Sequence, residues 1–511
     1  MLKVSENRRF LVHEDGSPFF FLGDTGWAVP QRLDRPEVDR YLQDRADNGF
    51  TVIQLVAISE FDGLTVPNAY GDLPLLDRDP ARPNDAYFHH LDYIAERAAA
   101  LGLHLALLPT WADKVGPAAW GTEPEVFTPA NAAVYGEWLG RRYRDAPIIW
   151  VLGGDRNPTE ERHVAVWRAM AAGLDRGDGG QHLMTFHPQG RSSSSSAFHA
   201  EEWLDFNMIQ SGHRGRDYPN YEMIARDYAL APPKPCLDAE PCYEDHPVVG
   251  GEGYLEEFDA RRAAYWALFA GAFGHTYGAN GIFQCWRPGL ADRFGVRRPW
   301  QDALDLPAAG QLRHARALLE ARPFLERIPD QTLLLTDPGS GADHRRATRA
   351  TDGGYAMIYS PTGGAFTANL GLLSGTEAVA HWYDPREGRA HPAGHWPTGT
   401  PQTFTTPTSG HGQDWVLVLD DAARNHPRPA NPPPPSPPSP RRALRRRSGK
   451  GRAERGRGEV RPRPHPQKGH QCPHYPRSNA PPSTRARNAR APAGPISAAR
   501  GASPTTTATR A

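Results

Sequence analysis

The chain has 511 residues, which is long enough for more than one domain. Its 58 Lys and Arg residues balance 58 Asp and Glu residues, but the charge is unevenly spread. Residues 425–511 hold 19 basic and 2 acidic residues, so residues 1–424 carry a formal charge of −17. An acidic body of this kind argues against nucleic acid as the main partner.

From residue 19 to about residue 325, apolar strand-like segments alternate with helix-like segments. The first predicted strand, 19–25, follows a hairpin that turns at Asp15-Gly16. The first predicted helix, 35–48, has Asp34 as its cap and Gly49 as its stop. Further strands are predicted at 51–58, 104–110, 147–154, 183–188, 206–212, 234–241 and 275–284, and further helices at 87–101, 128–143, from a Thr159 cap onward, at 198–204, 218–229 and 254–272.

Eight apolar strands that alternate with helices predict an α/β fold, a (β/α)8 TIM barrel. The first strand-to-helix turn, 23–26, lacks the G-x-G-x-x-G spacing of a dinucleotide-binding fold. After about Arg327 the pattern changes to short alternating strands, predicted at 332–337, 354–360, 364–371, 378–385, 401–407 and 414–421, which indicate a small all-β sandwich. We therefore expect a barrel at 1–327, a β-sandwich at 328–422 and a disordered Pro/Arg-rich tail at 423–511.

One strand end carries the strongest chemical signal. The run Ile148 to Leu152 stops at Gly153-Gly154 and then presents Asp155. In a (β/α)8 barrel the carboxyl ends of the strands hold the catalytic groups. An N-cap for the next helix is the structural alternative for Asp155, but Thr159 is better placed to cap it.

A second strand, 234–241, supplies Glu240 in the same position, just before a proline. Asp238, two residues earlier, is expected to lie deeper and to make a structural hydrogen bond or salt bridge. A buried ion-paired carboxylate is the alternative for Glu240. Two carboxylates on two barrel strands are the minimal equipment for cleaving a glycosidic bond.

Aromatic and polar residues gather at the other strand ends, where rings stack on sugars and polar groups bond to hydroxyls. The candidate substrate-binding residues are Asp24, Trp27, Gln54, Trp111, Asp113, Lys114, Arg156, Asn157, His187, Gln210, Tyr243, His275, Tyr277 and Trp286. His187, His213 and His275 lie on separate strands and could converge on a metal, which keeps a metal-dependent barrel hydrolase open as an alternative. Our assignment includes no metal ligand.

The four cysteines match neither a zinc motif nor a disulfide framework, so we read them as thiols in a reducing compartment. The start MLKVSENRRF has no apolar signal-peptide core, and no run of 18 apolar residues occurs. We therefore expect no membrane span and a cytoplasmic protein, or a secreted one if the start site is misassigned. The oligomeric state is not readable from the sequence.

Six stretches together resemble the apiosidase-like family of glycoside hydrolases: FFFLGDTGW (19–27), NGFTVIQ (48–54), PTWADKVG (109–116), WVLGGDRN (150–157), LDAEPCYE (237–244) and AGAFGHTYGANGIFQCW (270–286). They occur in the family's order over residues 1 to about 325. The resemblance implies a retaining barrel glycosidase with Asp155 as acid/base and Glu240 as nucleophile. Segment 330–421 resembles the β-sandwich that often follows such barrels and is sometimes labelled a collagen-binding domain.

The sequence thus predicts a glycoside hydrolase that releases a terminal sugar, such as apiose or a related pentose or deoxy sugar, by double displacement. This chemistry needs no cofactor, and the partner is a carbohydrate. For these roles Asp155 requires a raised pKa while Glu240 stays ionised. A glycan-binding barrel without catalysis is the alternative from another class.

Overall fold

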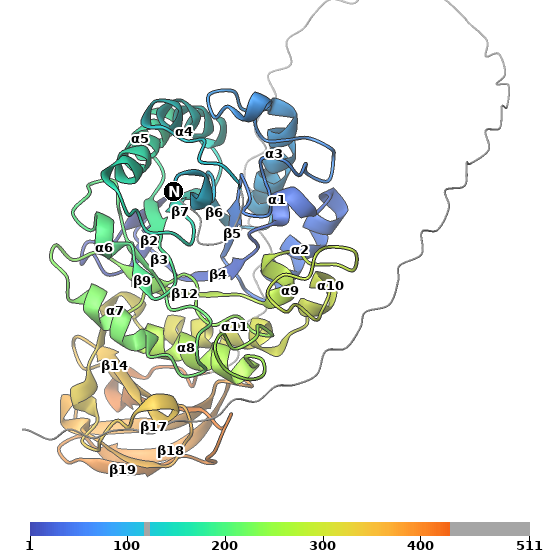
Figure 1. Ribbon diagram of the computed structural model, residues 1–511. Helices are drawn as coiled ribbons and strands as arrows, with labels where there is room; N and C mark the ends of the chain where they lie inside the picture. Colours follow the sequence, from blue (N-terminus) through green and yellow to red (C-terminus); the bar gives the residue numbers. More distant parts are fainter. Residues whose placement is uncertain (117–122, 430–511) are drawn as a thin grey trace, which may run out of the picture. The chain divides into compact units, whose positions relative to one another are not determined.

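The computed structural model describes residues 1–116 and 123–429. Its centre is a ring of eight parallel strands with helices around it (Figure 1), as the alternating pattern predicted. The strands are β4 (Phe21–Thr25), β5 (Val52–Val56), β6 (His104–Leu108), β7 (Ile148–Gly153), β8 (Met184–His187), β10 (Asn207–Gln210), β11 (Cys236–Asp238) and β12 (Gly274–Tyr277). The helices are α1 (Val29–Arg32), α2 (Arg35–Asp47), α3 (Asp85–Ala100), α4 (Pro129–Tyr143), α5 (Glu161–Asp178), α6 (Ser195–Phe198), α7 (Asn220–Tyr228), α8 (Glu257–Phe269), α9 (Asn280–Phe283), α10 (Trp300–Ala303) and α11 (Pro307–Glu320).

The ring is continuous in hydrogen bonds from β8 through β4 to β10, in the order β8-β7-β6-β5-β4-β12-β11-β10. The short strand β9 (Ser192–Ser193) pairs antiparallel with β10. Between β8 and β10 the ring is closed by side-chain bonds, because the Thr185 hydroxyl donates to Phe206 O at 2.7 Å and Met184 N donates to the Asp205 carboxylate. Closure matters for function because it brings the carboxyl ends of all eight strands to one end of the barrel.

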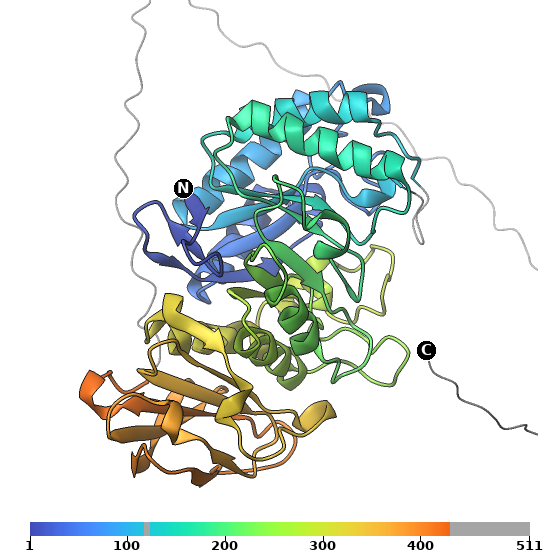
Figure 2. The same cartoon turned by 90° about the vertical axis from the view of Figure 1, so that its left-hand side faces the viewer.

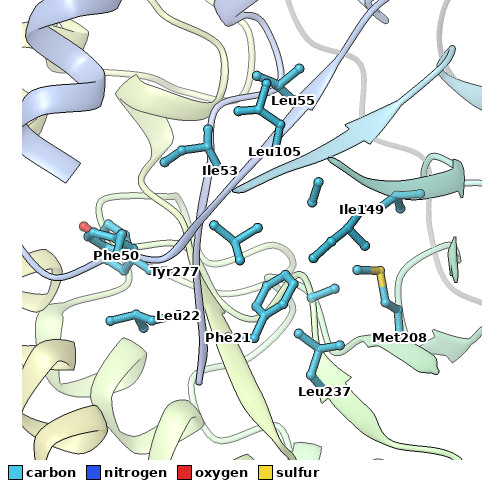
Figure 3. Packing of buried hydrophobic residues seen from close by; sticks show 14 of the residues in the cluster. Phe21, Leu22, Phe50, Ile53, Leu55, Leu105, Ile149, Met208, Leu237 and Tyr277 are labelled. Atoms are coloured by element: carbon cyan, nitrogen blue, oxygen red, sulfur yellow. The ribbon is translucent and has the colours of Figure 1, made fainter. Parts of the chain in front are cut away.

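The barrel core is apolar, and its strands are buried along their length. Figure 3 shows side chains from several strands in this core, among them Phe21, Ile53, Leu105, Ile149 and Leu237. β-Branched and leucine side chains on both faces of β6 and β7 explain why these two segments stand out as apolar runs in the sequence. Helix α4 precedes β7 in the chain and helix α5 follows it, and the two helices pack closely together (Figure 2). Glycines of one helix lie against the backbone of the other.

Local signals set most of the helix boundaries. Asp34 caps α2 in a reciprocal capping box with Glu37, and Thr128 caps α4 in the same way with Asn131. Thr159 does not cap α5, and this prediction was wrong. The helix begins at Glu161 without a side-chain cap, because the Thr159 hydroxyl instead lies 3.4 Å from His163 Nδ1.

Three other predicted elements differ from the structure. The strand expected at 275–284 ends at Tyr277, because the chain turns into helix α9, where Asn280 N bonds to Glu244 O at 3.0 Å. The helix expected at 198–204 is the shorter and earlier α6. The strand expected at 332–337 is instead a 3-10 turn at Gln331–Leu333, which the Asp330 side chain caps.

Two antiparallel sheets follow the barrel, as predicted, and share one apolar core. The first contains β13 (Arg327–Pro329), β14 (Arg346–Ala350), β15 (Tyr355–Ser360), β20 (Trp415–Asp421), β17 (Glu377–Asp384) and β18 (Arg389–Pro397), in that order. The second pairs β16 (Ala365–Ala368) with β19 (Gln402–Thr405). A small sheet of β1 (Leu2–Val4), β2 (Leu11–His13) and β3 (Pro18–Phe19) precedes the barrel and includes the predicted hairpin.

Buried ion pairs join the β-sandwich to helices of the barrel. Arg261 on α8 bonds to Asp414 at 2.7 and 3.1 Å, and Arg322, just after α11, bonds to Asp420 at 2.7 Å through both carboxylate oxygens. The boundary predicted at 327/328 stays a prediction. Most of the predicted tail, from residue 430 on, lies outside the described residues. Within the described part of the chain, no helix combines the length and apolarity that crossing a membrane requires.

Candidate active site

Strand β7 ends in a sharp turn that presents Asp155 at the carboxyl end of the barrel. Gly153 and Gly154 have φ values of 88° and 122°, which side chains rarely adopt. A Cβ on Gly154 would lie 2.7 Å from the Trp111 ring, so the turn also needs glycine for space. Asp155 itself has a φ of 58°, a left-handed conformation that aspartate tolerates better than most residues. Its side chain is 21% exposed.

Glu240 follows β11 and is more deeply placed, with 8% of its side chain exposed. Two imidazoles hold its carboxylate. His187 Nε2 lies 3.1 Å from Oε2, and His213 Nε2 lies 3.1 Å from Oε1. The predicted residue Asp238 is fully buried and accepts hydrogen bonds from Ser211 Oγ at 2.6 Å and from Asn220 Nδ2 at 3.0 Å, in agreement with its expected structural role.

The backbone fixes which nitrogen of each imidazole carries the proton. Asp155 N donates to His187 Nδ1 at 3.4 Å, and Tyr243 N donates to His213 Nδ1 at 3.3 Å. A ring nitrogen that accepts a hydrogen bond carries no proton, so in a neutral ring the proton is on Nε2. His213 can therefore donate to Glu240 without being charged, while His187 Nε2 faces the other carboxylate oxygen at 3.1 Å, and the left-handed turn at Asp155 is part of this arrangement.

These surroundings move the pKa values of the two carboxyl groups in opposite directions. Burial and the charge of Glu240 raise the pKa of Asp155 to about 6, against smaller opposing effects of Arg156, His187 and Gln210. Burial alone would also raise the pKa of Glu240, but the hydrogen bonds and charges of His187 and His213 lower it to about 2. At mildly acidic pH the site therefore holds one protonated and one ionised carboxyl group.

Both carboxyl groups line one cavity of about 480 Å³ at the ends of the strands. Of the predicted substrate-binding residues, Trp27, Trp111, Arg156, Gln210 and Tyr243 also line it. Trp27 packs edge-on against Trp111, with ring centroids 5.3 Å apart, so the two indoles form one aromatic wall. A cavity with aromatic walls and a few convergent polar groups is typical of a small-molecule site.

Several predicted residues do not reach this cavity, because their polar groups bond elsewhere. Asp24 points toward α2, where it accepts from Tyr41 at 2.6 Å and lies 3.8 Å from Arg45. Gln54 donates to Ala239 O at 2.9 Å, and Tyr277 donates to Glu244 at 2.7 Å.

Asp113 and Lys114 form a buried ion pair at 2.8 Å, and Lys114 also pairs with Glu123 at 2.8 Å. Their role is to fix the loops around the cavity rather than to line it. Asn157 donates to Ser192 Oγ at 2.8 Å and likewise lies outside the lining.

The three other predictions lie behind the site or beside it. His187 contacts the cavity only through Glu240 and the edges of Trp27 and Trp111. His275 is 1% exposed, and burial lowers its pKa to about 3. Trp286 follows α9 and does not line the cavity. No three His, Cys, Asp or Glu side chains within 1–116 and 123–429 are grouped as metal ligands would be.

Sequence reasoning missed several residues of the cavity wall. They are Glu60, Gln189, Gly190, Arg191, Ser211, Gly212, Arg214, His246, Val249, Phe283 and Phe294, and the lining also includes His213. Most of them lie on loops, where no periodic pattern marks them. Glu60 had a usable signal, because it is a carboxylate that directly follows the apolar run of strand β5.

Comparison with known proteins shows the family of the chain. Residues 5–326 match the family model described as "Apiosidase-like, catalytic domain". The chain belongs to the apiosidase-like family. This enzyme is therefore a glycoside hydrolase, and its substrate is a carbohydrate. Residues 328–420 match a second model, described as "Putative collagen-binding domain of a collagenase".

Solved structures show the same architecture over most of the chain. A glycoside hydrolase family 5 protein from Bacteroides vulgatus is 35% identical, with a TM-score of 0.78 over 85% of this chain and 96% of that one. A second structure, named only as a glycoside hydrolase, is also 35% identical, with a TM-score of 0.77 over 83% of this chain and 98% of that one. No curated protein sequence matches the chain.

Proposed function

We propose that this apiosidase-like enzyme is an exo-acting, retaining glycosidase in which Asp155 is the acid/base and Glu240 is the nucleophile. It removes a terminal sugar, apiose or a related pentose or deoxy sugar, from an oligosaccharide or glycoconjugate. The observation that carries the proposal is the presence of two carboxyl groups in one cavity with different neighbours: two imidazoles beside Glu240 lower its pKa to about 2, while burial and the charge of Glu240 raise that of Asp155 to about 6. A barrel that only bound glycans would have no use for this difference.

The reaction proceeds by two displacements. In the first, the Asp155 carboxyl group protonates the glycosidic oxygen while Glu240 attacks the anomeric carbon. The bond to the leaving group breaks, and a glycosyl ester forms on Glu240. In the second, the Asp155 carboxylate takes a proton from water, the water oxygen attacks the anomeric carbon, and the ester bond breaks to release the sugar and restore both side chains.

The surroundings of each carboxyl group support its role. The acid must be protonated before the reaction, which burial and the neighbouring negative charge of Glu240 favour for Asp155. The nucleophile must be ionised, which the hydrogen bond from His213 and the His187 imidazole at 3.1 Å favour for Glu240. When the ester forms, Glu240 loses its charge, one of the two causes that raised the pKa of Asp155 disappears, and the lower pKa suits Asp155 to the role of base in the second step.

The experiment that tests the proposal is a screen with a stereochemical readout. The purified enzyme is incubated with nitrophenyl glycosides of apiose, arabinose, xylose, rhamnose and fucose and with plant oligosaccharides, and the first sugar anomer released is identified by proton NMR. We expect hydrolysis of at least one neutral pentoside or deoxyglycoside with retained configuration, unchanged by chelator. Inverted configuration would contradict the mechanism, and loss of activity with chelator would favour a metal-dependent hydrolase.

A further inference from the structure

Glu60 is a buried carboxyl group in the wall of the active-site cavity, and the steps above do not use it. It follows strand β5 and is 4% exposed. Its Oε2 is buried and makes no hydrogen bond with any described residue. A buried polar atom without a partner is costly and is rarely kept unless something completes it.

Hydrogen bonds fix the backbone of the loop that carries Glu60. The lack of a hydrogen-bond partner for Glu60 Oε2 is therefore not the result of a poorly held loop. Lys114 Nζ donates to Ser59 O at 2.9 Å on one side of Glu60, and Gln31 Nε2 donates to Phe61 O at 3.0 Å on the other. Gly63 N also bonds back to Ser59 O. These bonds fix the backbone on both sides of Glu60 and so fix where its carboxyl group can lie.

The charges around Glu60 are mostly negative. Burial raises the pKa of Glu60 well above its usual range, and the charges of Asp155, Glu240 and Asp113 raise it further. Two cations, Lys114 and Arg32, act in the opposite direction, but both are engaged elsewhere. Lys114 is paired with Asp113 and Glu123, and the Arg32 guanidinium lies over the Phe61 ring, with Nη1 donating to Gln284 O.

We propose that Glu60 is a specificity residue that stays a neutral carboxylic acid and donates its O–H to an oxygen of the bound sugar. This inference rests on the proposed function and deepens it. In a wall that already holds two carboxyl groups, an uncharged sugar hydroxyl or ring oxygen can accept this proton, whereas a sugar carboxylate would meet like charge. The sugar in this part of the cavity is therefore neutral, and its binding completes the unpartnered oxygen of Glu60.

The test compares Glu60→Gln, which keeps a neutral hydrogen-bond donor, with Glu60→Leu, which has the same bulk and no donor. The substrate is the nitrophenyl pentoside or deoxyglycoside that the wild-type enzyme hydrolyses fastest. We expect Glu60→Leu to lose about 10–100-fold in kcat/KM, the effect of removing a buried hydrogen bond, and Glu60→Gln to recover most of it. The matched controls are Glu244→Gln and Glu244→Leu, because Glu244 is equally buried but bonds to Tyr277 outside the cavity.

Two results would overturn the inference. An equal loss in Glu60→Gln and Glu60→Leu would show that a negative charge is needed, and full activity in Glu60→Leu would show that the side chain contacts no substrate. Melting curves of all variants show whether each is folded. If Glu60→Leu does not fold, kcat/KM against pH decides the matter in the Asp155→Asn background, where the acid/base no longer titrates.

In the Asp155→Asn background the nitrophenolate leaves without being protonated. A fall in kcat/KM at alkaline pH, the alkaline limb of the profile, therefore reports the ionisation of Glu60. We expect the limb in Asp155→Asn and its disappearance in Asp155→Asn/Glu60→Gln, while Asp155→Asn/Glu244→Gln keeps it. The same limb with and without Glu60 would overturn the inference. Failure of the underlying function is distinguishable, because it would show as no glycoside hydrolysis by the wild-type enzyme or as unchanged activity in Glu240→Ala.

Discussion

The ends of strands β7 and β11 carry the same functional group in two different settings. Asp155, after β7, lies on a left-handed turn and is partly exposed. Its hydrogen bonds do not outweigh the effect of burial, so its pKa is raised. Glu240, after β11, is more buried, yet its pKa is lowered because His213 Nε2 bonds to it and His187 Nε2 lies 3.1 Å away. Burial therefore does not decide which carboxyl group is the acid. The hydrogen bonds and charges around each carboxyl group do, because they set its pKa.

The two settings are also connected. The backbone N–H of Asp155 bonds to His187 Nδ1, and His187 Nε2 faces Glu240, so the turn that positions Asp155 also orients an imidazole beside Glu240. Glu240 in turn raises the pKa of Asp155 through its charge. Removing either carboxyl group tests whether the two groups have different roles, and removing the hydrogen-bond donor His213 tests the cause of the low pKa of Glu240.

The largest effect is expected from Glu240→Ala. Because the glycosyl ester cannot form, turnover should fall by on the order of 10⁶-fold on every substrate, whatever its leaving group. Initial rates on a nitrophenyl glycoside and on a natural oligosaccharide measure this, with Glu244→Ala as the control. Measurable turnover of either substrate by folded Glu240→Ala would move the nucleophile elsewhere.

Asp155→Ala should instead depend on the leaving group. Natural glycosides with poor leaving groups should lose about 10²–10⁴-fold in kcat/KM, the usual contribution of a general acid. A nitrophenyl glycoside should form the glycosyl-enzyme at nearly the wild-type rate, because nitrophenolate needs little protonation. Near-normal activity of this variant on natural glycosides would show that Asp155 has a structural role.

Removing one hydrogen-bond donor should raise the pKa of Glu240 toward that of Asp155. In His213→Phe, the nucleophile keeps its burial but loses one N–H, so the pKa of Glu240 rises, by about one unit for a typical hydrogen bond. The acid limb of kcat/KM should move to higher pH by the same amount. His246→Phe is the matched control, because the His246 ring packs against that of His213, with centroids 4.4 Å apart and the planes tilted by 33°, without bonding to Glu240. An unmoved acid limb in His213→Phe would contradict the account of the low pKa.

The smallest effects concern stability, and their signs differ between the two positions. The pKa of Asp155, raised to about 6, makes the folded wild-type enzyme lose stability as the pH rises through 6. The free energy of unfolding of Asp155→Asn, measured relative to the wild type, should therefore be higher at pH 8 than at pH 4 by about 1–3 kcal/mol. The lowered pKa of Glu240, about 2, contributes stability that is fully present above about pH 4.5 and is lost as the pH falls through 2. Glu240→Gln should therefore be destabilised at pH 8.

Urea unfolding at pH 4 and pH 8 measures both changes in the free energy of unfolding. If the free energies of unfolding of Asp155→Asn and Glu240→Gln changed equally and in the same direction relative to the wild type, the opposite pKa shifts of Asp155 and Glu240 would be contradicted.

Much of the barrel was predictable because its strands are apolar on both faces, so that runs such as Val52–Val56 and Ile148–Gly153 stand out in the sequence. Errors arose where an apolar run is not a strand. Residues 278–284 are buried and read as the continuation of the strand, but the backbone bond from Asn280 N to Glu244 O turns the chain into helix α9. Strand β18 was missed because its exposed edge is rich in polar residues, Pro and Gly.

Two carboxylates of the cavity were predictable because each follows the end of a barrel strand by two residues, as Asp155 follows β7 and Glu240 follows β11. The side chains of Asp24, Gln54 and Tyr277 were predicted to bind substrate, but position along a strand does not reveal which side of the barrel wall a residue faces. The loop residues of the cavity, such as His246 and Phe294, depend on how distant loops meet. No sequence pattern encodes this directly.

The assignment of the two carboxyl groups can be tested in one measurement, by adding azide to each alanine variant with a nitrophenyl glycoside and determining the configuration of the glycosyl azide. In Asp155→Ala, azide enters from the side of the missing acid/base and attacks the ester on Glu240, so turnover should rise and the product should retain the substrate's configuration. In Glu240→Ala, azide occupies the place of the missing carboxylate and attacks the substrate directly, so the product should be inverted. The same configuration from both variants, or rescue of neither, would contradict the proposed roles.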